Sequence, residues 1–160
     1  MISGEQVVAT LVELGISHVV WLPDSTLGTW EGALERAGTP RLVRVCREGE
    51  AWAIAAGLHL GGARPLVMMQ CTGLFESGDS LRNFVHDYQL PLFALIGHRN
   101  QLNPGVTDSA RTFAQPILDA WQLACVSISN ADEWPRFATH YRDCAANGRA
   151  GVVLLAEGRM

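Results

Sequence analysis

Glu48 is the residue whose type and position best suit chemistry, because this acid follows an apolar, strand-like run and opens a helical segment. Side chains at the carboxyl end of a parallel strand face the crevice in which α/β proteins bind ligands. Residues 48–60 predict a helix with one tightly buried face, formed at helical spacing by Ala51, Ile54, Ala55 and Leu58. A helix dipole also favours an acid in the first turn, so a structural role for Glu48 stays open at this point.

Three further groups of polar residues stand where other apolar runs end. They are Asp24 with Ser25, then Gln70, Thr72 and Gly73, and finally His98 with Arg99. Each group has a structural explanation, since aspartate, serine and threonine cap helices and glycine supplies backbone freedom. If the runs are parallel strands of one sheet, these side chains lie at its ligand-binding edge together with Glu48.

The elements that would position these residues alternate regularly along the chain. Six apolar runs predict strands, at 18–22, 42–46, 65–70, 91–97, 124–128 and 151–155. Helical patterns lie between the Ser3 cap and Gly15, through Trp30 to about 37, and over 48–60, 113–123 and 131–146. We expect 72–89 to be a loop that leads into a helix, and 98–111 to be a long polar loop of the kind that is often functional.

This alternation predicts the α/β class in a three-layer architecture, with an open, mainly parallel sheet of about six strands and helices on both faces. The near-continuous apolar run 91–97 indicates a strand that is buried on both faces. A chain of 160 residues can form one full core. Since no repeat or linker interrupts it, we expect a single domain over 1–160.

Composition and charge argue against several functional classes. A net charge of −4 with scattered basic residues gives no reason to expect nucleic acid or an anionic membrane as partner. No run approaches roughly 18 apolar residues, and the first residues lack an export-type apolar core, so we expect a cytoplasmic protein. The four cysteines lack the spacing of a zinc site, which predicts buried free thiols and no metal held by this chain: Cys46, Cys71, Cys125 and Cys144.

Three motifs stand in order along the chain, and they begin at Leu22-Pro23-Asp24-Ser25, Glu48-Gly49-Glu50-Ala51 and Met69-Gln70. Together they make the chain resemble the pyrimidine-binding domain of thiamine-diphosphate enzymes. The first resembles the family's Val-Pro-Asp-Ser turn, and the second matches its Glu-x-x-Ala motif. Met69-Gln70-Cys71-Thr72-Gly73-Leu74 is similar to its Met-Gln-Asn-Ser-Gly-Leu. The order and spacing fit nearly the whole chain, which looks closest to the separate α-subunits of sulfopyruvate and phosphonopyruvate decarboxylases.

The resemblance implies that Glu48 contacts N1′ of the cofactor's aminopyrimidine. A carboxyl group at N1′ favours the tautomer that can remove the C2 proton of the thiazolium, which prepares the cofactor to act on a 2-keto acid. The resemblance also implies a set of neighbours: cofactor contacts from Gln70, Thr72 and Gly73, and substrate contacts or proton transfer from Asp24, Ser25, His98 and Arg99.

The chain departs from the family pattern at several positions. Trp21 stands where the family often has glycine, and a bulky indole there would reshape the entrance to the site. Cys71 replaces an asparagine, Thr72 a serine, and Phe75-Glu76 a Gly-Asn pair. A Glu76 carboxylate that faced the pocket would repel a sulfonate or phosphonate, which points to another 2-keto acid or to carboligation.

The resemblance also implies that half of the active site belongs to another chain. The family's second domain holds the diphosphate through Mg²⁺, with a Gly-Asp-Gly motif and a downstream asparagine. Gly78-Asp79-Ser80 does not match, because no apolar strand precedes it and its third residue is not glycine. We therefore expect a separate β-subunit that carries the diphosphate and Mg²⁺, in an α₂β₂ assembly or a multiple of it.

The leading hypothesis is the α-subunit of a two-subunit, thiamine-diphosphate-dependent 2-keto acid decarboxylase, which is a lyase. One alternative is a carboligase or synthase subunit of the same cofactor class. The other is a non-catalytic assembly module that kept the fold, although such a module has no need for the Glu48 carboxylate.

Overall fold

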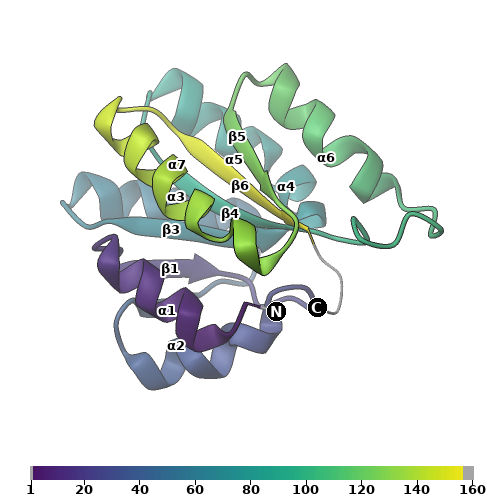
Figure 1. Cartoon of the computed structure of the whole chain (residues 1–160). Helices are drawn as coiled ribbons and strands as arrows, with labels where there is room; N and C mark the ends of the chain where they lie inside the picture. Colours follow the sequence, from purple (N-terminus) through teal and green to yellow (C-terminus); the bar gives the residue numbers. More distant parts are fainter. Residues whose placement is uncertain (1, 157–160) are drawn as a thin grey trace.

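Six parallel strands form the centre of the molecule, which we describe over residues 2–156 of a computed structural model. The order of the strands across the sheet is β2-β1-β3-β4-β6-β5. Their bounds are β1 His18–Trp21, β2 Arg41–Arg44, β3 Pro65–Gln70, β4 Phe93–His98, β5 Ala124–Ile128 and β6 Gly151–Ala156. Helices cover both faces of the sheet (Figure 1), so the predicted α/β class and three-layer architecture are confirmed.

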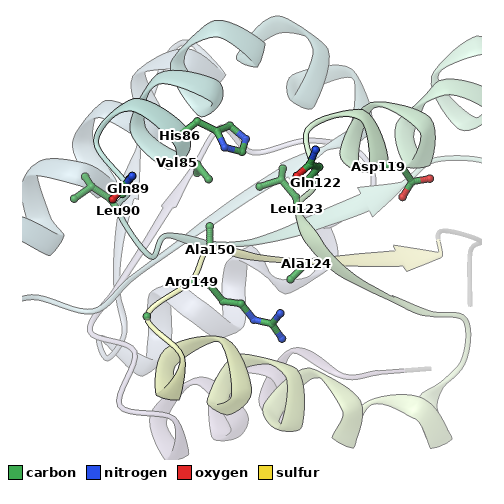
Figure 2. A pocket seen from close by; sticks show the side chains of 11 residues that line it. Val85, His86, Gln89, Leu90, Asp119, Gln122, Leu123, Ala124, Arg149 and Ala150 are labelled. Atoms are coloured by element: carbon green, nitrogen blue, oxygen red, sulfur yellow. The ribbon is translucent and has the colours of Figure 1, made fainter.

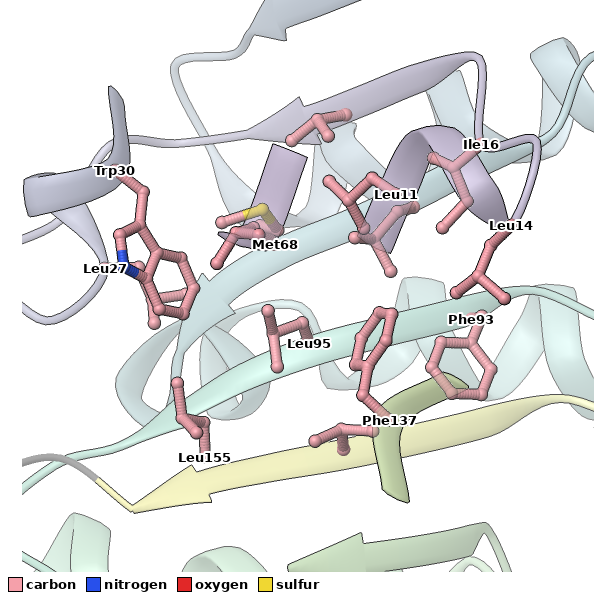
Figure 3. Close-up of a cluster of buried hydrophobic side chains, with 14 of the residues drawn as sticks. Leu11, Leu14, Ile16, Leu27, Trp30, Met68, Phe93, Leu95, Phe137 and Leu155 are labelled. Carbon is pink, nitrogen blue, oxygen red and sulfur yellow. The ribbon is translucent and has the colours of Figure 1, made fainter. Parts of the chain in front are cut away.

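One face of the sheet is covered by α1 (Gly4–Glu13), η1 (Gly28–Trp30), α2 (Glu31–Ala37) and α7 (Pro135–Ala146). Their buried side chains meet strand residues that point to the same side, and Figure 3 shows Phe137 beside Phe93 and Leu95 in this cluster. The rings of Phe93 and Phe137 cross edge to face at a centroid distance of 5.8 Å. Burial of one such side chain contributes roughly 1.5–3 kcal/mol.

The other face is covered by α3 (Glu48–Leu60), α4 (Cys71–Glu76), α5 (Gly78–Arg82) and α6 (Ser109–Ala120). Alternate residues of the strands point to this second cluster, among them Val67 and Met69 of β3. Strands that are buried on both faces need the near-continuous apolar runs that predicted them.

Helix α3 begins at Glu48 and ends at Leu60, as predicted, but its buried face is different. Ile54 is 38% exposed, whereas Trp52 is buried and its Nε1 donates to Ser77 Oγ at 2.9 Å. This hydrogen bond satisfies the indole inside the core, so the helix turns Trp52 inward and Ile54 outward. The residues of α3 that are buried are Ala51, Trp52, Ala55 and Ala56.

The segment after β3 is helical almost throughout. This corrects the first part of the expectation for 72–89, a loop that leads into a helix. Helix α4 begins directly at Cys71, α5 follows, and the π-helical turn η2 (Asn83–Asp87) completes the segment. Leu74 and Leu81 bury themselves against the sheet, and this tertiary packing outweighs the weak helical signal of the sequence. Helix α6 also begins earlier than predicted, at Ser109, because Asp108 caps it by accepting from Ala110 N at 2.9 Å.

The four cysteines are free, as predicted, but they are not all buried. Cys71 and Cys144 are buried and Cys125 is partly buried, whereas Cys46 is exposed in the turn before α3. Burial raises the pKa of the Cys71 thiol and raises that of Cys125 to about 11. Among residues 2–156, no helix is long and apolar enough to cross a membrane.

Candidate functional site

The carboxyl ends of β1 to β4 bring most of the predicted site residues to one edge of the sheet. Gln70 ends β3 and pairs with Gly97 of β4, while Trp21 ends β1 and pairs with both Arg44 of β2 and Met68 of β3. Each of these strands runs into a turn or a helix start at this edge, as predicted for parallel strands.

The Glu48 side chain lies directly over Gly73. A Cβ atom on Gly73 would be 2.5 Å from Glu48 Cγ and 2.7 Å from Oε1, so only glycine leaves room for the acid in this position. Glu48 is half-buried, and its carboxylate forms no hydrogen bond or ion pair with any residue that the structure describes. The structure thus brings Glu48 and Gly73 together and leaves the acid free to bind a ligand.

A second acid secures the turn that carries Glu48. Glu76 Oε1 accepts from Arg47 Nη2 at 2.9 Å and from Arg47 Nε at 3.2 Å, and Glu76 Oε2 accepts from Gly49 N at 2.8 Å. The Gly49 N–H and then the Arg47 guanidinium hold the pKa of Glu76 below its usual value. Glu76 is therefore engaged with α3, which removes the reason to expect it to repel an anionic substrate.

Two oxygen atoms near Gly97 are buried without a partner among the described residues, Gln70 Oε1 and Thr26 Oγ1. Gln70 pairs with Gly97 in the sheet, and the Thr26 methyl group packs where a Gly97 Cβ would lie. A buried oxygen atom without a hydrogen-bond partner destabilises the folded chain. We therefore expect a ligand or a water molecule to form a hydrogen bond with each of these two atoms. Thr26 was not among the predicted site residues, although it directly follows Ser25.

The Asp24 carboxylate is fully used within its own turn. Asp24 Oδ1 accepts from Thr26 N at 2.7 Å and Leu27 N at 2.9 Å, and Oδ2 accepts from Trp21 Nε1 at 3.0 Å. Trp21 is completely buried in the core, so the expectation that its indole reshapes the entrance is wrong. Ser25 is exposed beside this turn. The capping explanation for Asp24 is thus the one that the geometry favours.

His98 and Arg99 are occupied by the segment that follows β4. The buried His98 places Nε2 3.0 Å from the main-chain oxygen of Arg111. Arg99 donates to both carboxylate oxygens of Asp108, from Nε at 2.9 Å and from Nη2 at 3.1 Å. The side-chain hydrogen bonds from Arg99 and Asn100 hold the pKa of Asp108 well below its usual range. These contacts order the loop, and a role of either residue in the reaction stays a prediction.

A cavity of about 640 Å³ lies at the opposite, amino-terminal edge of the sheet (Figure 2). It is lined by η2 and by the turns before β5 and β6, including His86, Gln122 and Arg149. Close to it, ligand atoms of His140, Asp143 and Cys144 lie within 4.8 Å of one another, but Asp143 is paired with Arg149. None of the residues predicted for the site lines this cavity.

Comparison with known proteins relates this geometry to characterised chains. No family model matches the chain. The α-subunit of sulfopyruvate decarboxylase from Methanococcus maripaludis is 27% identical over 159 residues, which cover 98% of this chain and 95% of that protein. The chain is therefore similar to that α-subunit over nearly its whole length. The resemblance predicted from the three motifs is confirmed.

Other proteins that are similar to this chain have related names. A sulfopyruvate decarboxylase α-subunit from Methanothermobacter thermautotrophicus is 31% identical over 61% of this chain and 59% of its own length. Phosphonopyruvate decarboxylase from Streptomyces viridochromogenes is 32% identical over 68% of this chain, but only 27% of that protein is covered. The longer relative therefore contains a large part that has no counterpart in this chain.

A solved structure supports the assignment of the fold. The X-ray structure of a candidate thiamin diphosphate-dependent enzyme from Mycobacterium smegmatis matches 97% of this chain with a TM-score of 0.74. The two chains are 19% identical, and the match covers 30% of the solved chain. This chain thus has the fold of one part of that larger protein.

Proposed function

We propose that the chain is the α-subunit of a two-subunit, thiamine-diphosphate-dependent 2-keto acid decarboxylase, in which Glu48 activates the cofactor's aminopyrimidine. The observation that carries this proposal is the Glu48 carboxylate, which is half-buried, seated on Gly73 and without a partner in the described part of the chain. An acid in this state at the ligand-binding edge of an α/β sheet suits proton sharing with a bound heterocycle.

The residues around Glu48 fit the pyrimidine half of such a cofactor. Gln70 Oε1 is a buried acceptor without a donor, and Gly73 leaves the space that the acid fills. Glu48, Gln70, Thr72 and Gly73 are the residues that would hold the group. Thiamine diphosphate, when bound, supplies an electron sink for the decarboxylation of a 2-keto acid.

The chain itself would contribute a carboxylate that shares a proton with the ligand, and two ordered turns beside it. Glu48 would hold a proton at its carboxylate oxygen against a ring nitrogen. Asp24 and Asp108 would keep the two flanking turns in place through the hydrogen bonds that they already make. A site that is assembled before the ligand binds loses less conformational entropy when it binds.

The substrate class follows from the relatives together with the charges at the site. The relatives are named as decarboxylases of sulfopyruvate and of phosphonopyruvate. Because the Glu76 carboxylate is engaged by the Gly49 amide and by Arg47, it gives no reason to reject a 2-keto acid with a second acidic group. Trp21 and Glu76 have roles inside the fold, so these two departures no longer favour carboligation. An assay with a 2-keto acid and an aldehyde acceptor distinguishes ligation from release of CO₂.

The diphosphate and Mg²⁺ would be held by a separate β-subunit, in an α₂β₂ assembly or a multiple of it. Three relatives are named as α-subunits, which supports a partner chain for this protein as well. A single domain over 1–160 and a cytoplasmic location are parts of the same proposal.

The first experiment tests the partner and Glu48 in sequence. The tagged chain is recovered from its native cell with its partner, and the complex is assayed with sulfopyruvate and other 2-keto acids. We expect Glu48→Gln to leave assembly intact and to reduce turnover by roughly 10²-fold or more, as removal of a general acid–base group does.

Glu50→Gln is the matched control, because it alters an acid in the same turn. Glu50 Oε2 accepts from Cys46 N and Arg47 N, and the amide oxygen of glutamine can still accept from both. Full turnover by the Glu48→Gln complex would contradict the mechanism. Recovery of the chain alone, with no response to thiamine diphosphate, would favour the non-catalytic module instead.

A further inference from the structure

Helix α4 contacts the first turn of α3 at two points that are three residues apart. Gly73 lies under the Glu48 side chain, and Glu76 binds the backbone of the next residue, Gly49. Residues at i and i+3 lie on the same face of a helix, so one face of α4 supports both the side chain and the main chain of this turn.

The Glu76 contact with the main chain is the stronger part of the arrangement. The Arg47 side chain is 73% exposed, and an ion pair of this kind contributes little in water. The hydrogen bond from Gly49 N to Glu76 Oε2 is 2.8 Å long and joins an ionised acceptor to an otherwise unpaired amide of the first helical turn. It therefore fixes the backbone on which Glu48 stands.

Close packing around Gly49 supports the same conclusion. A Cβ on Gly49 would lie 3.3 Å from Ser80 Oγ and 3.6 Å from Glu76 Oε2. The backbone of α3 thus approaches α4 and α5 closely at this residue, which brings the amide within reach of the short Glu76 side chain.

We propose that Glu76 is a positioning residue for Glu48: by accepting the Gly49 N–H, it holds the first turn of α3 at the place where the acid meets its ligand. This inference rests on the proposed function of Glu48. Phe75-Glu76 is the pair that stands where the family has Gly-Asn. In this proposal, the glutamate of that pair has the role of holding Glu48 in place. The partner of Glu76 is Gly49, and no contact with substrate is required.

Two substitutions separate the hydrogen bond from the charge. Glu76→Gln removes the charge but keeps an oxygen that can accept from Gly49, whereas Glu76→Ala removes both. Asp79→Asn is the matched control, because Asp79 is an exposed acid on the adjacent α5 that pairs with Arg82. All three variants are made in the complete chain and assembled with its partner.

We expect the turnover number of Glu76→Ala to fall roughly 10- to 100-fold, since a small misplacement of a reacting group has effects of this size. The KM for the keto acid should change less than threefold, because Glu76 does not touch the substrate. Glu76→Gln should remain within about threefold of the unmodified complex, and Asp79→Asn should equal it. Equal losses in Glu76→Ala and Glu76→Gln, or no loss in either, would overturn the proposal.

Hydrogen exchange at the Gly49 amide tests the same contact without any activity. We expect Glu76→Ala, but not Glu76→Gln, to speed exchange of this amide at least tenfold in the full chain. If exchange at Gly49 stays slow in Glu76→Ala, the positioning proposal fails even if Glu48 proves essential. If Glu76→Ala speeds exchange at Gly49 but Glu48→Gln is fully active, the mechanism assigned to Glu48 fails. The hydrogen bond between Glu76 and Gly49 would then have no catalytic role.

Discussion

The position of the Glu48 side chain depends on Gly73, a neighbour that has no side chain. Gly73 lies in a helix with an ordinary backbone conformation, so the reason for glycine there is space. The sequence indicated both residues as cofactor contacts. The structure adds that Gly73 lies against the acid, and its contact with the cofactor stays a prediction. A sequence pattern can place two residues at the same edge of a sheet. It does not show whether their atoms are in contact.

Gly73→Ala should displace the acid while the fold persists. The new Cβ would meet Glu48 Cδ at 2.9 Å, so the carboxyl group must move away. We expect the complex to lose at least tenfold in turnover, and the free energy of unfolding to fall by about 1–3 kcal/mol from overpacking.

Gly57→Ala on α3 is the control for Gly73→Ala. Nothing lies within 4 Å of a Cβ on Gly57, and alanine stabilises a helix by roughly 0.5–1 kcal/mol relative to glycine. Chemical denaturation and the decarboxylase assay measure both variants. Unchanged turnover in Gly73→Ala would show that the position of Glu48 does not depend on this contact.

At the scale of elements, Asp108 joins the loop after β4 to helix α6. Its carboxylate accepts from Arg99, from Asn100 Nδ2 at 2.7 Å and from Ala110 N at 2.9 Å. Arg111 adds hydrogen bonds to the main-chain oxygens of Asn100 and Asn103, the latter at 2.8 Å. The long polar segment is therefore ordered by the chain itself.

Asp108→Asn should reduce stability in a manner that depends on pH. Asparagine can still cap α6, but it cannot pair with the Arg99 guanidinium. Because the pKa of Asp108 is lower in the folded chain than the value of about 3.9 expected when unfolded, its ionised form stabilises the fold at neutral pH. The difference in free energy of unfolding between the unmodified chain and Asp108→Asn should be constant above about pH 5. It should shrink as the pH falls below about 4.

Asp108→Ala should be less stable than Asp108→Asn at every pH, by roughly 0.5–2 kcal/mol, because the cap is lost as well. Urea denaturation from acid to neutral pH measures all three proteins. A difference between the unmodified chain and Asp108→Asn that grows in acid would contradict the assignment of the charge.

Elements with strong periodicity were predictable, and those defined by tertiary contacts were not. The six strands and α3 follow apolar patterns that a sheet with two buried faces requires. The short helices α4 and α5 lack such a pattern, since their stability comes from Leu74, Ser77 and Leu81 packed beneath α3. The orientation of Trp52 and the roles of Trp21 and Glu76 depend on partners distant in sequence, which spacing does not reveal.

At the scale of the whole molecule, the sheet has an order that differs from the order of the chain. Strand β6 lies between β4 and β5; it pairs with β4 along its whole length and with β5 over Gly151 to Leu155. Residues of β6 such as Val153 and Leu154 enter the cores on the two faces. Strand β5 is therefore attached to the rest of the sheet through β6.

A chain that ends after Arg149 should lose cooperative folding. Without β6, β5 loses the strand with which it pairs, α7 loses its contacts with β6, and β4 exposes one edge. We expect broad thermal unfolding and fast amide exchange in β5, measured by circular dichroism and exchange mass spectrometry. Addition of a peptide of residues 150–156 should restore part of the protection, whereas the reversed peptide should not. A sharp transition at the original temperature would contradict this dependence.

The central place of β6 also has a consequence during synthesis on the ribosome. Strands β1 to β4 can associate as they emerge, but β5 must wait beside an incomplete sheet until residues 151–156 have left the exit tunnel. During this interval the edge of β4 presents unpaired backbone groups, which other nascent chains could bind. Slow translation just before β6 would prolong this exposure, so the yield of correctly folded chain should depend on codon choice in that short region.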